Sequence, residues 1–326
     1  MRRSHIKLAV FFLGMVLLTL VGIAIKGYAI FHQPMHTSTG TMIRLTRTAS
    51  ASTLIRQLSD QQLIDSPQVV LWLMRARGMT QRLQAGVYDI HPHETLNSFL
   101  WRVIHGDVLV ASFRIVDGMT KHQVAALLAQ APYLKYAASD WANVAQGYGD
   151  AEGLLLADTY YYDADSSAAS LLNRARDHLL QSLNQVWAAR DVDLPYTDPY
   201  QLLIVASILE KETAHADERR LISGVIVNRL KKNMPLQMDP TVIYGLGEQF
   251  TGKLTHEDMQ LASPYNTYRH RGLPPTPIAM VGKAALDAAA HPQHTNYLYF
   301  VAKGDGRHQF SESYDAQRAA ISHYLR

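Results

Sequence analysis

The sequence predicts an α+β protein in which a single membrane-spanning helix precedes a small αβ subdomain and a larger α+β domain. An uncharged apolar stretch stands near the N-terminus, short strand patterns are scattered among amphipathic helices, and the length of 326 residues suits about two domains. We therefore expect a cytoplasmic N-terminus at residues 1–7, an anchor at 8–27, a linker at 28–41, the subdomain at 42–107 and the larger domain at 108–326.

The composition excludes several classes of protein. The chain has no cysteine, 48% apolar and 18% charged residues, 19 Gly and 13 Pro. These values rule out a disulfide scaffold, collagen, a long disordered tail and a polytopic membrane bundle. The net charge is +3, but seven basic residues precede the first acidic residue, Asp60, and the remaining 24 basic and 28 acidic residues give −4. A body of that sign binds polyphosphates poorly, so we expect no nucleic-acid partner.

The apolar stretch Leu8–Ile25 has 18 residues without a charge. At 1.5 Å per residue it is just long enough to cross a bilayer core of ~30 Å. A cleaved signal peptide is the alternative, but no site of the A-x-A type follows the stretch. Because Arg2, Arg3 and Lys7 precede it, the positive-inside rule keeps the N-terminus in the cytoplasm and exports the body. The lack of cysteine fits an oxidising compartment.

Beyond the anchor, residues 32–41 are polar and contain the Pro, Gly, Ser and Thr of a tether. The subdomain then alternates strand and helix patterns, which we place at Met42–Leu45 (strand), Ser52–Leu58 and Val69–Met74 (helices), Leu83–Ile90 (strand) and Thr95–Val103 (helix). The larger domain is expected to begin with a strand at Val108–Val116 and to continue with helices at Lys121–Gln130 and Ala168–Ala189. The apolar stripes of these helices are assigned to the core.

A later helix with two carboxyl groups near its end is the strongest candidate for chemistry. Asp198 suits an N-cap, Pro199 suits the first helical position, and the helix continues through LLIVASILEKET. Glu210 and Glu212 are two residues apart and therefore lie on roughly opposite faces. Glu212 follows apolar residues at the i−3, i−4 and i−7 positions, so its face is the drier of the two.

A carboxyl group at the end of such a stripe is expected to have a raised pKa, because desolvation and the negative end of the helix dipole both favour the neutral form. A general acid that works at neutral pH needs such a pKa. The alternative is a solvated glutamate paired with Lys211 or Arg219, which is common at helix ends. The helix alone leaves both interpretations open.

Loops downstream of this helix collect amide, hydroxyl and aromatic side chains. Such groups bind sugars, since polar atoms match the hydroxyls and flat rings cover the C–H surface. We therefore expect a carbohydrate cleft. Its candidate members besides Glu212 are Asn228, Gln237, Asp239, Thr241, Tyr244, Tyr265, Asn266 and Tyr268.

Metal chemistry finds little support in the sequence. Pro292 separates His291 from His294, Glu212 and His215 form a single Glu-x-x-His, and no His-Glu-x-x-His occurs. We expect neither a metal ion nor an organic cofactor.

Several ordered motifs resemble the endolytic murein transglycosylase family, also called YceG-like proteins. They are Ala206–Thr213, Val227–Leu230, Leu236–Gly245, Tyr265–Tyr268 and Gly272–Pro275. The unit around Leu83–Tyr88 resembles the LysM-like subdomain of that family, and the anchor also fits. The resemblance implies that Glu212 is the catalytic acid and that the other cleft residues, together with Asp158, bind substrate. One departure is Leu154–Ala157, which stands where the family has an aromatic-rich segment and a proline before Asp158.

The resemblance also implies a reaction. The β-1,4 bond between N-acetylmuramic acid and N-acetylglucosamine of nascent peptidoglycan would be cleaved without water, leaving a 1,6-anhydro end and limiting glycan strand length. Ordinary glycosidases need two carboxyl groups. Here the C6 hydroxyl of the muramic acid attacks intramolecularly, so proximity replaces the second group. The implied location is the inner membrane with the catalytic domain on the periplasmic side, and penicillin-binding synthases are the implied protein partners.

Three alternatives stay open. A membrane-anchored hydrolase of the lysozyme type would need a second acid near Glu212, for which Asp239 and Asp158 are the candidates. A non-catalytic glycan-binding scaffold would need no acid. A membrane-anchored peptidase has the least support, because the one Ser-x-x-Lys, Ser4 to Lys7, precedes the apolar stretch and no zinc motif occurs.

Overall fold

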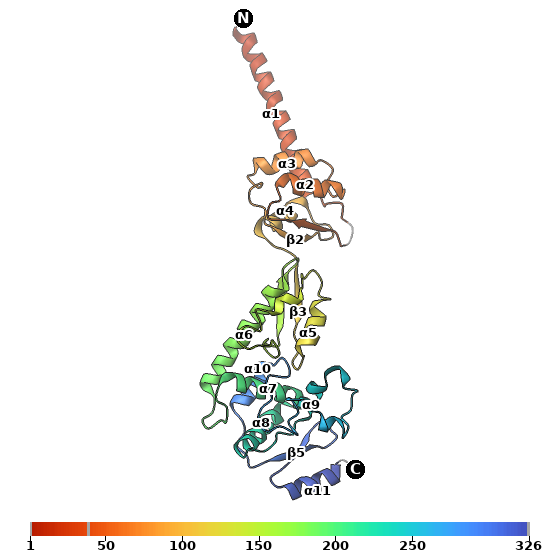
Figure 1. The fold of residues 1–326 in the computed structure, drawn as a ribbon. Helices are drawn as coiled ribbons and strands as arrows, with labels where there is room; N and C mark the ends of the chain where they lie inside the picture. The colour runs from red at the N-terminus through yellow and green to blue at the C-terminus, as the bar shows by residue number, and fades with distance from the viewer. Residues whose placement is uncertain (1, 38–39, 325–326) are drawn as a thin grey trace. The chain divides into compact units, whose positions relative to one another are not determined.

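The structure, a computed structural model, describes residues 2–37 and 40–324. Its contacts divide the chain into two compact units. Unit 1 comprises Met1–Ala111 and Asp163–Asp165, and unit 2 comprises Ser112–Tyr162 and Ser166–Arg326. Both units contain helices and strands (Figure 1), so the predicted α+β class is confirmed. The division falls at Ala111, whereas the sequence prediction ends the subdomain at residue 107.

The N-terminal helix α1 extends over Arg2–His32. Its segment Phe11–His32 has a mean hydropathy of 2.0 and is only 6% buried inside the protein. Leu13 and Leu18 are 71% and 73% exposed. Apolar side chains without a protein cover are typical of a helix that faces lipid. The described chain therefore has one N-terminal helix that is long and apolar enough to cross a membrane.

The predicted linker, residues 28–41, differs from an extended tether in its first half. Helix α1 continues to His32, because the first proline after the anchor is Pro34 and nothing before it interrupts the helix. Phe31 and Met35 are buried in the core of unit 1. The chain that leaves the apolar helix is thus packed against the folded unit. Residues 38 and 39 of the predicted linker lie outside the described chain.

Unit 1 contains a two-stranded antiparallel sheet, in which β1 (Met42–Leu45) pairs with β2 (Gly86–Asp89). Three helices accompany it: α2 (Ala51–Asp60), α3 (Pro67–Ala76) and α4 (Leu96–His105). The hydroxyls of Ser50 and Thr95 accept bonds from backbone N–H groups and begin α2 and α4, and Gly106, at a φ of 70°, ends α4. The predicted order of strands and helices is confirmed, while a LysM-like identity stays a prediction.

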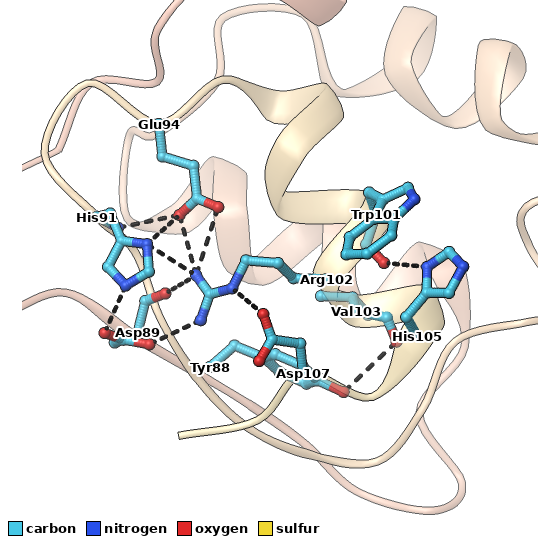
Figure 2. Close-up of polar contacts among 9 residues, drawn as sticks. All are labelled: Tyr88, Asp89, His91, Glu94, Trp101, Arg102, Val103, His105 and Asp107. Atoms are coloured by element: carbon cyan, nitrogen blue, oxygen red, sulfur yellow. Dashed lines mark hydrogen bonds and ion pairs between the residues drawn. The ribbon is translucent and has the colours of Figure 1, made fainter. Parts of the chain in front are cut away.

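Arg102 on α4 joins three carboxylates of unit 1 (Figure 2). Its Nε donates to Asp107 Oδ2 at 3.2 Å, its Nη1 to Glu94 Oε2 at 3.2 Å and its Nη2 to Asp89 Oδ1 at 2.8 Å. His91 Nε2 lies 3.1 Å from Asp89 Oδ2. We call Arg102, Asp89, Glu94, Asp107 and His91 the Arg102 cluster. It fastens α4 to the end of β2 and to the loop between them.

Unit 2 is mainly helical. Its helices are α5 (Lys121–Leu128), α6 (Ala168–Ala189), α7 (Pro199–Glu212), α8 (Ala216–Lys231), α9 (Asp239–Leu246), α10 (Lys283–Ala290) and α11 (Tyr314–Tyr324). Strand β3 (Val110–Arg114) pairs with β4 (Thr159–Asp163), and β5 (Tyr299–Ala302) pairs antiparallel with β6 (His308–Ser311). The predicted helices at Lys121–Gln130 and Ala168–Ala189 are therefore present, the first ending two residues earlier at Leu128.

Helix α7 is the central helix of unit 2. Residues 202–209 are all buried, and α10, α6, α8 and α9 contact it. Asp198 Oδ1 accepts a hydrogen bond from Gln201 N at 3.0 Å and Pro199 is the first helical residue, which confirms the predicted start. The helix ends at Glu212, because Thr213 has an extended backbone. Glu212 is thus held at the last position of a buried helix.

Candidate active site

The two glutamates at the end of α7 have opposite environments. Glu210 Oε1 accepts a hydrogen bond from Arg219 Nη2 at 3.1 Å, and its Oε2 accepts one from Gly282 N at 3.1 Å. The two side chains of this ion pair are 5% and 12% exposed. Burial raises the pKa of Glu210, while the bond from Gly282 and the charge of Arg219 act in the opposite direction. Glu210 therefore has a partner for each oxygen and joins α7 to α8 and α10.

Glu212 is half-buried as a residue, but its Oε2 is fully buried and has no hydrogen-bond partner among the described residues. Burial, and then the nearby charge of Asp239, raise the pKa of Glu212 to about 8. A carboxyl group with that pKa keeps its proton at pH 7 and can give it to a bound molecule. Of the two candidate glutamates, Glu212 has the properties of a general acid.

Asp239 and Tyr268 lie beside Glu212. Asp239 is the first residue of α9, and its Oδ1 accepts a hydrogen bond from the Tyr268 hydroxyl at 2.5 Å. Burial, this bond and the charges of Asp239 and Glu212 raise the pKa of Tyr268. The phenol therefore stays protonated and acts as a donor. Of the two candidates for a second acid, Asp239 is the one whose charge acts on Glu212.

Asp158 lies elsewhere in unit 2, just before β4. It is exposed, and its Oδ1 accepts a hydrogen bond from Thr159 N at 2.7 Å. No interaction between Asp158 and Glu212 is found among residues 2–37 and 40–324. The preceding Leu154, Leu155 and Leu156 are fully or almost fully buried. The three leucines of the departure thus fill the core of unit 2, and Ala157 is the part of it that is half-exposed.

Gln237 is held by a buried arginine. It has a φ of 51°, and its Oε1 accepts a hydrogen bond from Arg229 Nη1 at 3.0 Å. The same guanidinium donates to the carbonyls of Leu298, Pro235 and Leu236 at 2.6, 3.0 and 2.8 Å. Burial lowers the pKa of Arg229. Arg229 joins α8, the loop before α9 and the segment before β5, a role that the Asn-Arg motif did not reveal.

Three predicted cleft residues use their polar groups inside the protein. Thr241 Oγ1 donates to Met238 O at 2.6 Å, and Asn266 Nδ2 donates to Met259 O at 3.0 Å and to Leu261 O at 2.9 Å. Both residues are fully buried. Asn228 Nδ2 donates to Thr295 O at 2.8 Å and to Tyr297 O at 3.0 Å. In this structure these amides and hydroxyls hold loops together.

Tyr244 and Tyr265 form an aromatic pair with ring centroids 4.7 Å apart. The Tyr244 hydroxyl donates to Glu152 Oε2 at 3.2 Å, and the Tyr265 hydroxyl lies 2.9 Å from Thr276 Oγ1. Glu152 is 3% exposed and also accepts from Lys121 N at 2.9 Å. Burial raises its pKa, and these bonds oppose the shift. Sequence reasoning missed Glu152, since no pattern links it to residues 92 positions further along the chain.

A groove of about 650 Å³ lies along this side of unit 2. Its lining includes Glu152, Tyr244, Pro240, Ile243, Phe250 and Lys211. Glu212 is not part of the lining, but its neighbour Lys211 is, as is Pro240, the neighbour of Asp239. The groove thus extends to the residues that neighbour Glu212 and Asp239 in the sequence. The lining combines these apolar and aromatic side chains with polar ones, among them Lys121, Gln123 and Glu248, and this combination suits a ligand of alternating polarity such as a glycan.

Comparison with known proteins identifies the family. The model of the YceG-like family matches residues 43–323, so the chain belongs to that family, as the motifs predicted. The endolytic murein transglycosylase of Bacillus subtilis (strain 168) is 36% identical over 175 residues, which cover 53% of this chain and 48% of that protein. The endolytic murein transglycosylase of Streptococcus pneumoniae serotype 2 (strain D39) is 30% identical over 155 residues, covering 46% and 28%.

Among solved structures, a YceG-like protein from Listeria monocytogenes is similar, with a TM-score of 0.54 and 26% identity. The match covers 86% of this chain and 98% of that one. The chain aligns with about half the length of the Bacillus subtilis relative.

Proposed function

We propose that the protein is an endolytic lytic transglycosylase that cleaves the β-1,4 bond between N-acetylmuramic acid and N-acetylglucosamine in peptidoglycan. The observation that carries the proposal is the buried, unpartnered Oε2 of Glu212 at the end of α7. A carboxyl group with a pKa of about 8 is a ready proton donor at neutral pH. The names of the two bacterial relatives support murein as the substrate class.

The reaction needs one proton that leaves and returns. Glu212 donates its proton to the glycosidic oxygen, and the C1–O4 bond breaks to release the 4-hydroxyl of N-acetylglucosamine. The muramic C6 hydroxyl then attacks C1 and gives its proton back to the Glu212 carboxylate, which closes the 1,6-anhydro ring. No water enters, because the nucleophile belongs to the substrate. Glu212 ends in its starting state, so no cofactor is required.

The neighbouring side chains would orient the sugar. Asp239 and Tyr268 offer an acceptor and a hydroxyl beside Glu212. Tyr244 offers ring surface along the groove, with the Tyr265 ring beside it, and Gln237 offers its amide nitrogen, since its oxygen is used by Arg229. Thr241, Asn266 and Asn228 would act indirectly by holding the loops that carry these groups. Asp158 would contribute to substrate binding at a distance from the acid.

Helix α1 supports a location at a membrane. We infer that α1 anchors the protein in the inner membrane as a single span, with residues 1–7 in the cytoplasm and both units on the periplasmic side. The arginines and lysine before the span support this orientation. Nascent glycan strands and the penicillin-binding synthases that make them would then lie within reach. A LysM-like character of unit 1 belongs to the same proposal.

A lysozyme-type hydrolase is the second candidate, and one observation favours it. Asp239 lies close enough to Glu212 for its charge to raise the pKa of that group. In a hydrolase, Asp239 would attack C1 or activate a water, and the product would gain one molecule of water. The hydrogen bond from Tyr268 occupies Asp239 Oδ1 and thereby weakens it as a nucleophile.

Mass spectrometry of the product ends tests the proposal. The full-length protein, reconstituted in detergent micelles, is incubated with purified peptidoglycan, and the released muropeptides are weighed. The proposal expects 1,6-anhydro ends, one water lighter than hydrolytic ends. Hydrolytic ends alone would establish the lysozyme-type reaction instead. A wild-type protein that binds peptidoglycan but releases no muropeptides would favour the glycan-binding scaffold.

A further inference from the structure

Helix α3 of unit 1 has an exposed apolar face without a cover. Val69, Trp72 and Ala76 follow the i, i+3, i+7 spacing of one helix face. Val69 is 44% and Trp72 is 59% exposed, and Ala76 is exposed as well. Val70 and Met74, on the other face, are fully buried in the core of unit 1. Core packing therefore explains only one face of α3.

The position at which α3 crosses α1 fixes the depth of α3 relative to the membrane that α1 would cross. Leu73 of α3 packs on Gly27 of α1, where an added Cβ would come within 3.3 Å of Leu73 Cδ2. The Arg77 guanidinium lies 4.3 Å from the ring centroid of Phe31. The uncharged stretch ends at Ile25. Measured along the helix axis from Ile25, Gly27 lies ~3 Å further on and Phe31 ~9 Å further on. The headgroup layer of one leaflet is ~5 to 8 Å thick.

Helix α3 therefore crosses α1 at the level that headgroups would occupy. Figure 1 agrees, since within unit 1 α3 is drawn where the free part of α1 begins. Tyr28 of α1, at the same level, is 61% exposed and stacks on His32 at 3.9 Å. Tryptophan and tyrosine are the residues enriched at this level of a membrane.

The charged residues within α3 and in the loop that follows it are all basic. Arg75, Arg77 and Arg82 are exposed, as is Lys26 of α1. The sequence between Asp65 and Asp89 contains no acidic residue. Cations beside an apolar face suit the phosphates and the acyl boundary of a phospholipid layer.

We propose that the outer face of α3, formed by Val69, Trp72 and Ala76, rests in the headgroup layer of the bilayer that α1 crosses. Arg75, Arg82 and Lys26 contact lipid phosphates around it. Unit 1 is then a second, peripheral membrane contact that fixes its orientation on the lipid surface. This inference rests on the proposed anchoring of α1 and goes beyond it, because an anchor alone does not bring the outer face of α3 into contact with lipid.

Fluorescence quenching in vesicles tests the contact. The full-length protein, with Trp101, Trp141 and Trp187 changed to Phe, is reconstituted in phosphatidylethanolamine–phosphatidylglycerol vesicles with or without lipids brominated near the carbonyl end of the chain. We expect bromolipid to quench Trp72 at least twofold and the bilayer to shield it from iodide. Variants are accepted if their thermal unfolding matches wild type.

The matched control retains Trp101 as the sole tryptophan. Trp101 is 56% exposed, close to the value for Trp72, but it lies on α4. The residue before α4, Thr95, forms a β-bridge with Pro34, which lies beyond the end of α1 and further from the apolar stretch than Gly27. We expect Trp101 to be open to iodide and weakly quenched by bromolipid. In the Trp72 protein, replacing Arg75 and Arg82 by Gln should reduce the quenching severalfold in vesicles that contain phosphatidylglycerol.

Vesicle flotation separates this proposal from the anchor. A protein that does not float with the vesicles contradicts the anchor and, with it, the contact of α3. A protein that floats, but whose Trp72 is open to iodide and unaffected by bromolipid, overturns the contact of α3 alone. The exposed face would in that case be available to a protein partner.

Discussion

The Arg102 cluster of unit 1 and the end of α7 in unit 2 both contain a buried carboxyl group, but only the cluster places a cation beside each of its carboxylates. Arg102, 10% exposed, has bonds to Asp89, Glu94 and Asp107, so each carboxylate has a cation beside it (Figure 2). Burial opposes ionisation in the cluster, yet the bond and charge of Arg102 lower the pKa of Asp89. Glu212 has no such cation, and its pKa rises to about 8.

The difference shows that a carboxyl group paired with a cation suits a structural role, whereas an unpaired buried carboxyl group suits proton transfer. A paired carboxylate is stable in its ionised form and gives up nothing at neutral pH. An unpaired buried carboxyl is stable only when it is protonated, so it is ready to transfer a proton. Glu210 and Glu212 show a related difference within two residues of α7. Burial raises the pKa of both, but Arg219 pairs with Glu210 and opposes the shift, whereas Glu212 has no such partner among the described residues.

The largest expected effect is that of Glu212→Gln. The amide fills the same volume but cannot donate a proton to the glycosidic oxygen, so we expect turnover to fall by about 10² to 10⁴-fold. Muropeptide release from purified peptidoglycan measures the change. Binding of the glycan should persist, since the groove is unaltered. A variant with more than half of the wild-type activity would contradict the role of Glu212.

Removing the cation from the Arg102 cluster should cost stability and leave the chemistry intact. Arg102→Met leaves Asp89 and the buried Glu94 without their cation, and we expect unit 1 to lose about 3 kcal/mol of unfolding free energy. Because Arg102 lowers the pKa of Asp89, this stabilisation is present above the ordinary aspartate pKa and is lost as the pH falls. Denaturant unfolding at pH 7 and pH 3.5 should show a smaller difference between variant and wild type at the lower pH. An equal difference at both values would argue against a charged cluster.

Glu210→Gln is the matched comparison for Glu212→Gln. It keeps a hydrogen-bond acceptor but removes the charge that faces Arg219, and we expect a loss of about 2 kcal/mol in stability. Turnover should stay within tenfold of wild type, since Glu210 supports the helix end and does not donate the proton. Thermal unfolding and muropeptide release, measured on the same preparations, check both values. A turnover as low as that of Glu212→Gln would break the contrast between the two glutamates.

The smallest effect is expected for Tyr244→Phe. The change removes one hydrogen bond to Glu152 Oε2 and keeps the ring beside Tyr265, so stability should fall by about 1 kcal/mol. If the ring is the part that faces the glycan, the apparent KM should change less than it does for Tyr244→Ala. A titration of the rate against glycan concentration compares the two variants. Equal losses would assign the contribution to the hydroxyl.

Much of the fold could be predicted from the sequence where local rules apply. The cap at Asp198, the strand and helix order of unit 1 and the long α6 helix follow from capping residues and periodicity over neighbouring positions. The predicted linker at residues 28–41 differs from the structure, in which α1 continues to His32, because the polar residues 32–41 suggested a tether and the tertiary packing of Phe31 was not visible. Strand β4 was not predicted, because its sequence has no alternating pattern and its formation depends on pairing with β3.

The candidate site was predictable in part. The stripe beneath Glu212 indicated a dry environment, and the structure gives that residue a buried oxygen. Sequence could not show that Thr241 and Asn266 turn their polar groups into the protein, since loop side chains of the same type serve ligands elsewhere. Glu152 and Arg229 act through partners brought together by the fold, and no spacing rule reaches across such separations.

The central claim is that Glu212 holds a proton at neutral pH, and its titration tests this most directly. Infrared difference spectra of wild type minus Glu212→Gln, recorded with the full-length protein from pH 4 to pH 10, isolate the carboxyl band of this one residue. We expect the protonated band to persist at pH 7 and to disappear around a pKa of about 8. A band that disappears near pH 4.5, as for a solvated glutamate, would contradict the account.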